Sequence, residues 1–281
     1  MAESEGPGAE VLGSWVDGIA ANSVPLDDRG LQYGDGLFET ILVRNGRARF
    51  LDAHFARLDL GCQRLGIRFA ASADLRAEIT RAVAHAPAAA ILKLIVTRGS
   101  GPRRGYAPRG TFPPRRVLTL FAAPSPVSLM EGADARIASL RLAENPVLAG
   151  IKHLNRLENV LAAAEPGHEL VFESLLLDAA GNIVCGTMSN VFTVIAGRLN
   201  TPPVDRCGVA GVMRSVVLRQ AAALGIICEQ RRMPLADFLA ADEVFITNAR
   251  IGVVPLRRVG EHSFMSNLAR TLAANIEPLD A

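Results

Sequence analysis

The chain has 281 residues, of which 49% are hydrophobic, and its formal net charge is only +2. This length suits two cores of roughly 110 to 160 residues each, and the near-neutral charge argues against a general polyanion binder. The N-terminal segment, MAESEGPGAEVLGSWV, lacks the basic start and apolar run of a signal peptide, and no apolar stretch reaches the ~18 residues that span a bilayer. We therefore expect a cytoplasmic globular protein that binds neither a membrane nor nucleic acid.

The cysteines are far apart and form no CxxC pair, and no histidine stands at metal-ligand spacing from them. In a chain without an export signal, scattered thiols are typical of a reduced, intracellular protein, and we expect no metal site. The chain also lacks GxGxxG and GxxxxGK[ST], which excludes the commonest nucleotide-binding loops.

In the first half, Glu39–Leu51 contains two β-rich runs around Asn45-Gly46, a dipeptide that suits a type I′ hairpin because both positions tolerate a positive φ. A helix capped by Asp52 should follow, since apolar residues recur on one helical face. These residues are Phe55, Leu58, Cys62 and Leu65. A second helix is expected to begin at a Ser72 cap.

Residues 91–97 (ILKLIVT) and 117–123 (VLTLFAA) read as strands. Between them, residues 98–116 are rich in Gly, Pro and Arg and predict a long loop. Residues 122–132, which include PSPVSLMEG, are the best candidate for an interdomain linker.

The second half is expected to contain several strands and helices that alternate without a regular βαβ rhythm. The expected strands are residues 135–142, 170–178, 189–195 and 243–247, and the expected helices are residues 154–165, 211–224 and a C-terminal one. The sequence therefore predicts two α+β domains, residues 1–121 and 133–281, rather than one doubly wound sheet.

Lys152, in AGIKHLNRLE, stands at a strand-to-helix junction between Ile151 and Leu154. Apolar neighbours can strip a lysine of its hydration, which lowers its pKa and frees the amine to condense with an aldehyde. The alternative, more common by position alone, is a lysine whose stem packs while its ammonium reaches water. The adjacent His153 and the more distant His54 are interpreted as helix-surface imidazoles.

A phosphate-bearing aldehyde cofactor would need a bidentate cation and backbone N–H groups at a helix start. Arg57, in HFARL, can supply the cation, and the turn GVAGVMR at residues 208–214 can supply the N–H groups. The alternatives are an exposed helix charge for Arg57 and an ordinary glycine-rich helix start for the turn.

Six blocks carry a resemblance to a known family. In chain order they are DRGLQYGDGLFET, HFARL, RGSGPRRGY, GIKHLNRLE, GTMSNVF and GVAGVMR. In this order the sequence resembles the class IV aminotransferases, the fold-type-IV pyridoxal-phosphate enzymes, over residues 25–255. The resemblance implies a two-domain, D-amino acid aminotransferase-like α+β fold with pyridoxal 5′-phosphate between the domains, and a homodimer.

Carried over residue by residue, the resemblance implies that Lys152, in the C-terminal domain, binds the cofactor covalently and acts in catalysis. It also implies that Arg57, in the N-terminal domain, binds the cofactor's phosphate. The other residues that it places around the phosphate are Val212, Met213, Thr247, Asn248 and Ala249.

Three blocks, QYGDGLFET, the RGxGxRGY-like loop and KHLNRLE, resemble most closely the aminodeoxychorismate lyase branch of the family. This branch eliminates pyruvate and leaves p-aminobenzoate for folate biosynthesis. By the resemblance Arg103, Arg104 and Tyr106 are candidates for holding the substrate's carboxylates, on a loop that in relatives reaches toward the partner's active site. Tyr33 resembles the aromatic residue that lines the substrate pocket.

The sequence departs from the family pattern at Cys185, which is expected to face the cofactor's pyridine nitrogen. The family usually places a glutamate there, just before the block GTMSNVF, and it keeps that nitrogen protonated. Neither Val184 nor Gly186 can replace the glutamate, and Glu173 lies too far upstream to be assumed. A thiol holds such a proton poorly. Our hypothesis is that Cys185 is tolerated because aromatisation of the product drives an elimination.

Three alternatives stay open. A class IV transaminase acting on D- or branched-chain amino acids would share the same blocks, because spacing alone does not separate elimination from transamination. The arginines of residues 98–116 could form a polyanion-binding loop, although the prolines and the near-neutral charge favour a solvated interface loop. A catalytically silent family member is compatible with Cys185.

Overall fold

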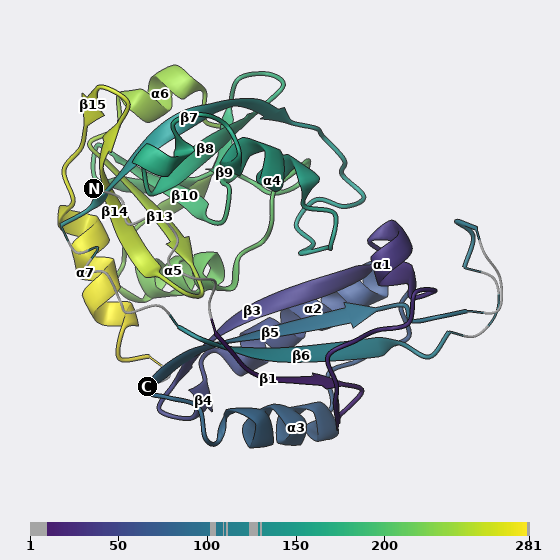
Figure 1. The fold of residues 1–281 in the computed structure, drawn as a ribbon. Helices are drawn as coiled ribbons and strands as arrows, with labels where there is room; N and C mark the ends of the chain where they lie inside the picture. Colours follow the sequence, from purple (N-terminus) through teal and green to yellow (C-terminus); the bar gives the residue numbers. More distant parts are fainter. Residues whose placement is uncertain are drawn as a thin grey trace. The chain divides into compact units, whose positions relative to one another are not determined.

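The computed structural model describes residues 10–101, 105–108, 110, 112–123, 129 and 131–279. The chain divides into two compact units, each built on its own β-sheet and helices, which confirms the expected α+β fold class (Figure 1). Of the described residues, the first unit comprises those from 10 to 123 together with Ile151–Asn155, and the second comprises those from 129 to 150 and from 156 to 279. Among the described residues, no helix is both long and apolar enough to cross a membrane.

The first unit has an antiparallel sheet with strand order β2-β1-β6-β5-β3-β4. Its strands are β1 (Val11–Val16), β2 (Ile19–Ala20), β3 (Gly36–Arg44), β4 (Arg47–Ala48), β5 (Ala89–Thr97) and β6 (Arg115–Ala122). Its helices are α1 (Arg29–Tyr33), α2 (Leu51–Leu65) and α3 (Ala73–Val83). Side chains alternate along β3, so that Ile41 is fully buried in the core with residues of α2 and α3, whereas Phe38 and Thr40 are half-buried on the opposite face.

Local sequence signals set several boundaries in this unit. Asn45 and Gly46 have φ values of 49° and 73°, as the expected hairpin requires. The Ser72 side chain accepts a hydrogen bond from the amide of Leu75, which confirms the expected cap of α3. The expected Asp52 cap is wrong: Phe50, with a φ of 53°, is the N-cap of α2, and Asp52 lies in the first turn. There its carboxylate still suits the positive end of the helix.

The second unit has a nine-stranded mixed sheet in its described part. Its strands are β7 (Ala133–Leu142), β8 (Glu173–Asp178), β9 (Ile183–Gly186), β10 (Asn190–Ile195), β11 (Arg198–Thr201), β12 (Cys228–Gln230), β13 (Glu243–Asn248), β14 (Gly252–Val259) and β15 (His262–Ser263). Its helices are α4 (Leu157–Ala163), the 3-10 helix η1 (His168–Leu170), α5 (Val212–Ala223), α6 (Leu235–Leu239) and α7 (Asn267–Ile276). Phe192 and Phe245, on the neighbouring strands β10 and β13, stack in the core with ring centroids 4.9 Å apart.

The helix expected at residues 154–165 begins only at Leu157, because the preceding residues extend the sheet of the first unit. The amide of Phe38 donates to the Lys152 carbonyl at 3.0 Å, and the Leu154 amide donates to the Gly36 carbonyl at 3.0 Å. These bonds group Ile151–Asn155 with the first unit. The expected division at residues 122–132 instead assigns Lys152 to the C-terminal domain, and part of that linker lies outside the described residues.

Phe192→Ala is expected to lower the free energy of unfolding by about 3–5 kcal/mol, because Phe192 is fully buried against Phe245 and its removal leaves a cavity. Urea denaturation of the purified variant measures this loss. Leu224→Ala, at a position 42% exposed, is the control and should change stability by less than about 0.5 kcal/mol. Equal losses in the two variants would contradict the importance of this aromatic pair.

Candidate active site

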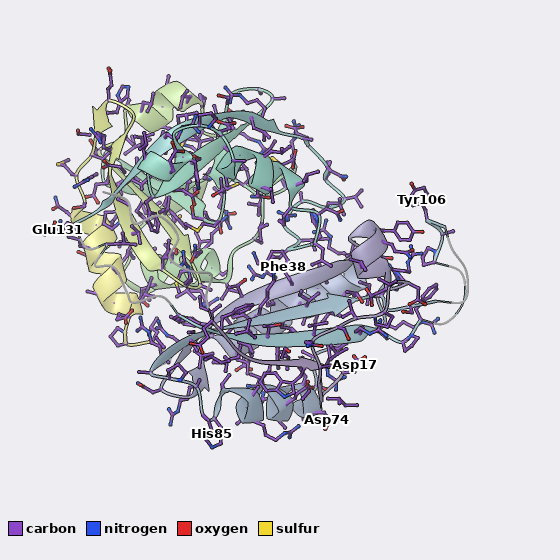
Figure 2. All side chains as sticks on the ribbon, viewed as in Figure 1. Asp17, Phe38, Asp74, His85, Tyr106 and Glu131 are labelled. Atoms are coloured by element: carbon purple, nitrogen blue, oxygen red, sulfur yellow. The ribbon has the colours of Figure 1, made fainter. Side chains whose placement is uncertain are left out.

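Lys152 lies in the segment that pairs with the edge of β3. It is next to the ring of Phe38, which Figure 2 labels on that strand. Its Nζ atom is 4.1 Å from the ring centroid, and the preceding residue, Ile151, is buried. Lys93, on β5, is 5.6 Å from the same ring. Only these two of the 30 Lys and Arg residues are lysines. The chain therefore offers an aldehyde just two side-chain amines, because a guanidinium stays protonated.

Glu39 follows Phe38 on β3 and points to the opposite face, into the core of the first unit, where it meets α2. Its side chain is 1% exposed. Arg57 donates from Nε to Glu39 Oε1 at 2.8 Å and from Nη2 to Oε2, so the two side chains form a bidentate pair. His54 Nδ1 lies 2.6 Å from the same Oε2. No sequence motif pointed to Glu39 as a site residue, although alternation along a strand would have placed its carboxylate at a buried position.

The protonation states of this cluster follow from burial and from the Arg57 charge. Burial alone would raise the pKa of Glu39, but the Arg57 guanidinium and the His54 hydrogen bond hold that pKa at about 2. Burial lowers the pKa of His54 below its ordinary value, and the Glu39 carboxylate opposes this only in part. A neutral His54 donates from Nδ1 to Glu39, and its Nε2 has no hydrogen-bond partner among the described residues.

His54 is therefore a buried member of an ion-pair cluster, and its interpretation as a helix-surface imidazole is wrong. The charge of Lys152 also lowers the pKa of His54, which indicates that Lys152 lies within electrostatic reach of the cluster. Arg57, which could have been an exposed helix charge, has a side chain only 13% exposed. In the first unit the structure thus places Lys152 within electrostatic reach of His54, which is bonded to the Glu39–Arg57 pair.

In the second unit, α5 begins at the glycine-bearing turn as expected. Gly211 is the N-cap and has no side chain to bond the first amides, and Val212 and Met213 are buried in the first turn. A Cβ on Gly211 would lie 2.0 Å from Asn190 Oδ1, so only glycine fits at this position. A helix start whose N–H groups are not capped by a side chain is a site suited to a phosphate.

Thr247 and Asn248 lie at the end of β13, beside Asn190 of β10. The register pairs Asn190 with Thr247, and the Thr247 hydroxyl donates to the Gly252 carbonyl at 2.7 Å. Asn248 accepts from the amide of Arg250 at 2.9 Å, which holds the turn that contains Ala249. Asn190 therefore lies next to both the start of α5 and the end of β13. The residues expected around the phosphate, at the start of α5 and at the end of β13, are thus neighbours within this unit.

Cys185, on β9, belongs to the same row of the sheet, because it pairs with Asn190 on one side and with Leu176 on the other. Its side chain packs in an apolar cluster that includes Val184 and Cys207. Burial raises the pKa of the Cys185 thiol well above its usual range, so the thiol is neutral at pH 7. A neutral thiol is a weak donor and cannot supply the negative charge that holds a proton on a pyridine nitrogen.

Glu173 does not replace the glutamate that is missing at position 185. Its buried carboxylate accepts from the amide and hydroxyl of Thr187, at 2.9 and 2.5 Å, and from the Ser189 hydroxyl at 2.7 Å. It also accepts from the amides of Ser174 and Met188. These bonds direct both carboxylate oxygens at the turn after β9. Glu173 therefore supports that turn, as its distance along the sequence suggested.

The expected substrate residues fall into two groups. Tyr33 and Tyr106 lie together, with ring centroids 5.5 Å apart and planes 60° apart. Tyr106 is 86% exposed, on the loop beside α1 in Figure 2. Arg103 and Arg104 lie outside the described residues.

The residues present fit pyridoxal phosphate in two of its three recognised features. Lys152 suits the aldehyde, and Arg57 in the first unit and the uncapped amides of α5 in the second unit are each, taken separately, of the kind that binds a phosphate. The third feature, a proton on the pyridine nitrogen, has no carboxylate at position 185 to hold it. The residue types in each unit therefore suit the cofactor's aldehyde and phosphate, and position 185 does not suit its pyridine nitrogen.

Glu39→Gln is expected to lower the free energy of unfolding by about 3 kcal/mol at pH 7, because it leaves the Arg57 guanidinium without its buried counter-charge. The folded pKa of Glu39 is below its ordinary value of 4.5, so its contribution is present above pH 4.5 and is lost as the pH falls toward 2. Urea denaturation from pH 3 to 7 should therefore show a difference between variant and parent that shrinks in acid. A constant difference would contradict this linkage.

Comparison with known proteins shows the family to which the chain belongs. The model of the family described as amino-transferase class IV matches residues 36–259. An aminodeoxychorismate lyase of Vibrio harveyi is 35% identical over 253 residues, which cover 86% of this chain and 89% of that protein. A D-alanine aminotransferase of Bacillus licheniformis is 30% identical over 259 residues, covering 91% of this chain and 89% of that protein.

Among solved structures, the chain is similar to a 4-amino-4-deoxychorismate lyase from Pseudomonas aeruginosa. The TM-score is 0.87 and the sequence identity 43%, and the match covers 95% of this chain and 100% of that chain. The family match spans β3 to β14 and so includes Glu39, Arg57, Lys152 and the start of α5. This chain therefore belongs to the amino-transferase class IV family.

Proposed function

We propose that this protein is a 4-amino-4-deoxychorismate lyase, which uses pyridoxal 5′-phosphate to eliminate pyruvate from aminodeoxychorismate and leave p-aminobenzoate for folate biosynthesis. The observation that carries the proposal is the 43% identity to the Pseudomonas aeruginosa lyase over that whole chain, against 30% to a D-alanine aminotransferase. We further propose that the protein acts in the cytoplasm as a homodimer, as the family resemblance implies.

Lys152 is the proposed catalytic residue. In this role its amine binds the cofactor covalently, is displaced by the substrate amine, and then accepts the proton from the ring carbon that bears nitrogen. When bound, the cofactor supplies a conjugated system that takes up the electron pair left on that carbon. Breaking the ring C–O bond expels enolpyruvate, which takes up a proton to become pyruvate, and the remaining ring becomes aromatic. The amine of Lys152 would then replace the product amine on the cofactor, so that p-aminobenzoate is released.

The remaining proposed residues bind and orient. The bidentate bond to Glu39 restricts the Arg57 guanidinium to one orientation, which suits it to a phosphate. In the second unit the amides at Val212 and Met213, with Thr247, Asn248 and Ala249, form the proposed remainder of the phosphate-binding set. The proposed residues for the substrate's ring and carboxylates are Tyr33, Tyr106, Arg103 and Arg104.

Cys185 favours elimination over transamination. A transaminase must stabilise a carbanion and then return the proton to a different carbon, and a protonated pyridine nitrogen assists this. The neutral Cys185 thiol does not hold that proton, whereas aromatisation drives the elimination without it. The second candidate function, a transaminase acting on D-amino acids, is supported by the 30% identity to the D-alanine aminotransferase.

Lys152→Ala is expected to abolish activity, because no second amine can take its place on the same backbone segment. The cofactor-loaded protein would be given aminodeoxychorismate, and pyruvate and p-aminobenzoate would be measured together. Equal release of both by the parent and neither by the variant supports the lyase. Lys93→Arg, which changes the chain's other lysine, is the matched control and should retain activity. If a visible band shows bound cofactor and neither product forms in the parent, the lyase assignment fails and transaminase assays follow.

Cys185→Glu tests the link between the pyridine nitrogen and the reaction. We expect lyase kcat to change by less than about tenfold, a barrier difference of roughly 1.4 kcal/mol, because aromatisation does not depend on the added carboxylate. Cys185→Gln, which adds similar volume without charge, controls for crowding in the apolar cluster. A much larger gain with glutamate alone would indicate an impaired enzyme and reject this account.

A further inference from the structure

Arg29, in α1, fixes the backbone of the loop between β5 and β6. The side chain is 6% exposed and donates from Nη1 to the Gly105 carbonyl at 2.7 Å and from Nη2 to the Tyr106 carbonyl at 2.8 Å. Its Nε donates to Asp35 Oδ2 at 2.8 Å. Three donors of one planar group are thus directed at two consecutive loop carbonyls and one carboxylate, an arrangement that only a guanidinium can make.

The same guanidinium also holds the aromatic side chains around this loop. It lies 4.8 Å from the ring centroid of Tyr33 and 5.7 Å from that of Phe112. The Tyr33 hydroxyl accepts from the Gly105 amide at 3.3 Å, and its ring meets that of Tyr106. Tyr33, one turn after Arg29 in α1, and Tyr106 in the loop are therefore held as one aromatic pair.

The platform that carries Arg29 is itself rigid. Asp28 caps α1 by accepting from the Gly30 amide at 2.8 Å, and it also accepts from Thr97 and Arg115 at the ends of β5 and β6. A Cβ on Gly30 would lie 2.2 Å from the Thr97 side chain, so α1 packs directly against β5. Arg29 therefore presents its donors from a position fixed to the sheet.

We infer that Arg29 is a positioning residue for substrate: it anchors the loop at Gly105 and Tyr106 so that Tyr33 and Tyr106 keep one arrangement for the ring of a cyclic dicarboxylate. The inference rests on the proposed function, in which Tyr33 and Tyr106 contact substrate. Arg29 itself touches neither substrate nor cofactor. The two candidate carboxylate-binding arginines directly precede Gly105 in the sequence.

Arg29→Lys tests the inference, because lysine keeps the charge and loses the planar fork. In the cofactor-loaded protein we expect KM for aminodeoxychorismate to rise about tenfold, the equivalent of one charge-assisted hydrogen bond. We expect a smaller change in kcat and an unchanged visible cofactor band. Limited trypsin digestion supplies a readout independent of activity: cleavage at residues 103–109 should be about tenfold faster in the variant.

Arg98→Lys is the matched control. Arg98 is 12% exposed and donates to the same Asp35 from Nε at 2.8 Å and from Nη2 at 3.1 Å. Its Nη1 and Nη2 also donate to the Gly66 and Leu65 carbonyls at the end of α2, and no bond of Arg98 reaches Gly105 or Tyr106 among the described contacts. Replacing the Arg98 guanidinium by the ammonium of lysine should leave both KM and the loop cleavage rate at the parent values.

Two results would overturn the inference: an Arg29→Lys variant with parental KM and parental loop cleavage, or equal changes in the Arg98→Lys control. The cleavage assay separates this outcome from a failure of the proposed function. If the parent shows no lyase turnover while only Arg29→Lys accelerates cleavage, the anchoring stands and the substrate assignment is rejected.

Discussion

The open edge of β3 determines where Lys152, the proposed catalytic residue, lies. The short strand β4 pairs only with Val43 and Arg44, so the other end of the same edge, at Gly36–Phe38, is free to bond the segment around Lys152. Unpaired strand edges are costly when buried, and here the chain fills the edge with its own later residues. The lysine is consequently held by main-chain bonds, which leaves its side chain to be placed by the ring of Phe38.

Alternation along β3 then couples this lysine to the arginine cluster. The side chain of Phe38 contacts Lys152. The side chain of Glu39, one residue later, points to the opposite face of the strand, toward α2, and pairs with Arg57. Two consecutive residues of one strand thus contact the amine of Lys152 and the guanidinium of Arg57. In the second unit, Cys185, Asn190 and Thr247 are paired across the neighbouring strands β9, β10 and β13. Residues paired in this way face the same side of a sheet, so these three side chains lie next to one another.

The sequence predicted features whose causes are local. The Asn45-Gly46 hairpin and the Ser72 cap depend on one or two residues, and the structure confirms both. Features that depend on distant partners could not be predicted in this way. His54 is buried because Glu39, fifteen residues earlier, bonds it. Leu154 has the periodicity of a helix and is nevertheless extended, because Gly36 accepts its amide hydrogen bond.

The near-absence of lysine gives the candidate site a chemical selectivity. An aldehyde condenses with any accessible unprotonated amine, and each additional surface lysine is a competing partner. Arginine performs the other cationic tasks of this chain without that competition, because its guanidinium remains protonated while it binds carboxylates and carbonyls bidentately. Arg57 with Glu39, and Arg29 with the loop at Gly105, both follow this rule. Only Lys93 and Lys152 are present, and both lie beside Phe38. An aldehyde bound here would therefore react with whichever of these two amines its binding site brings it close to.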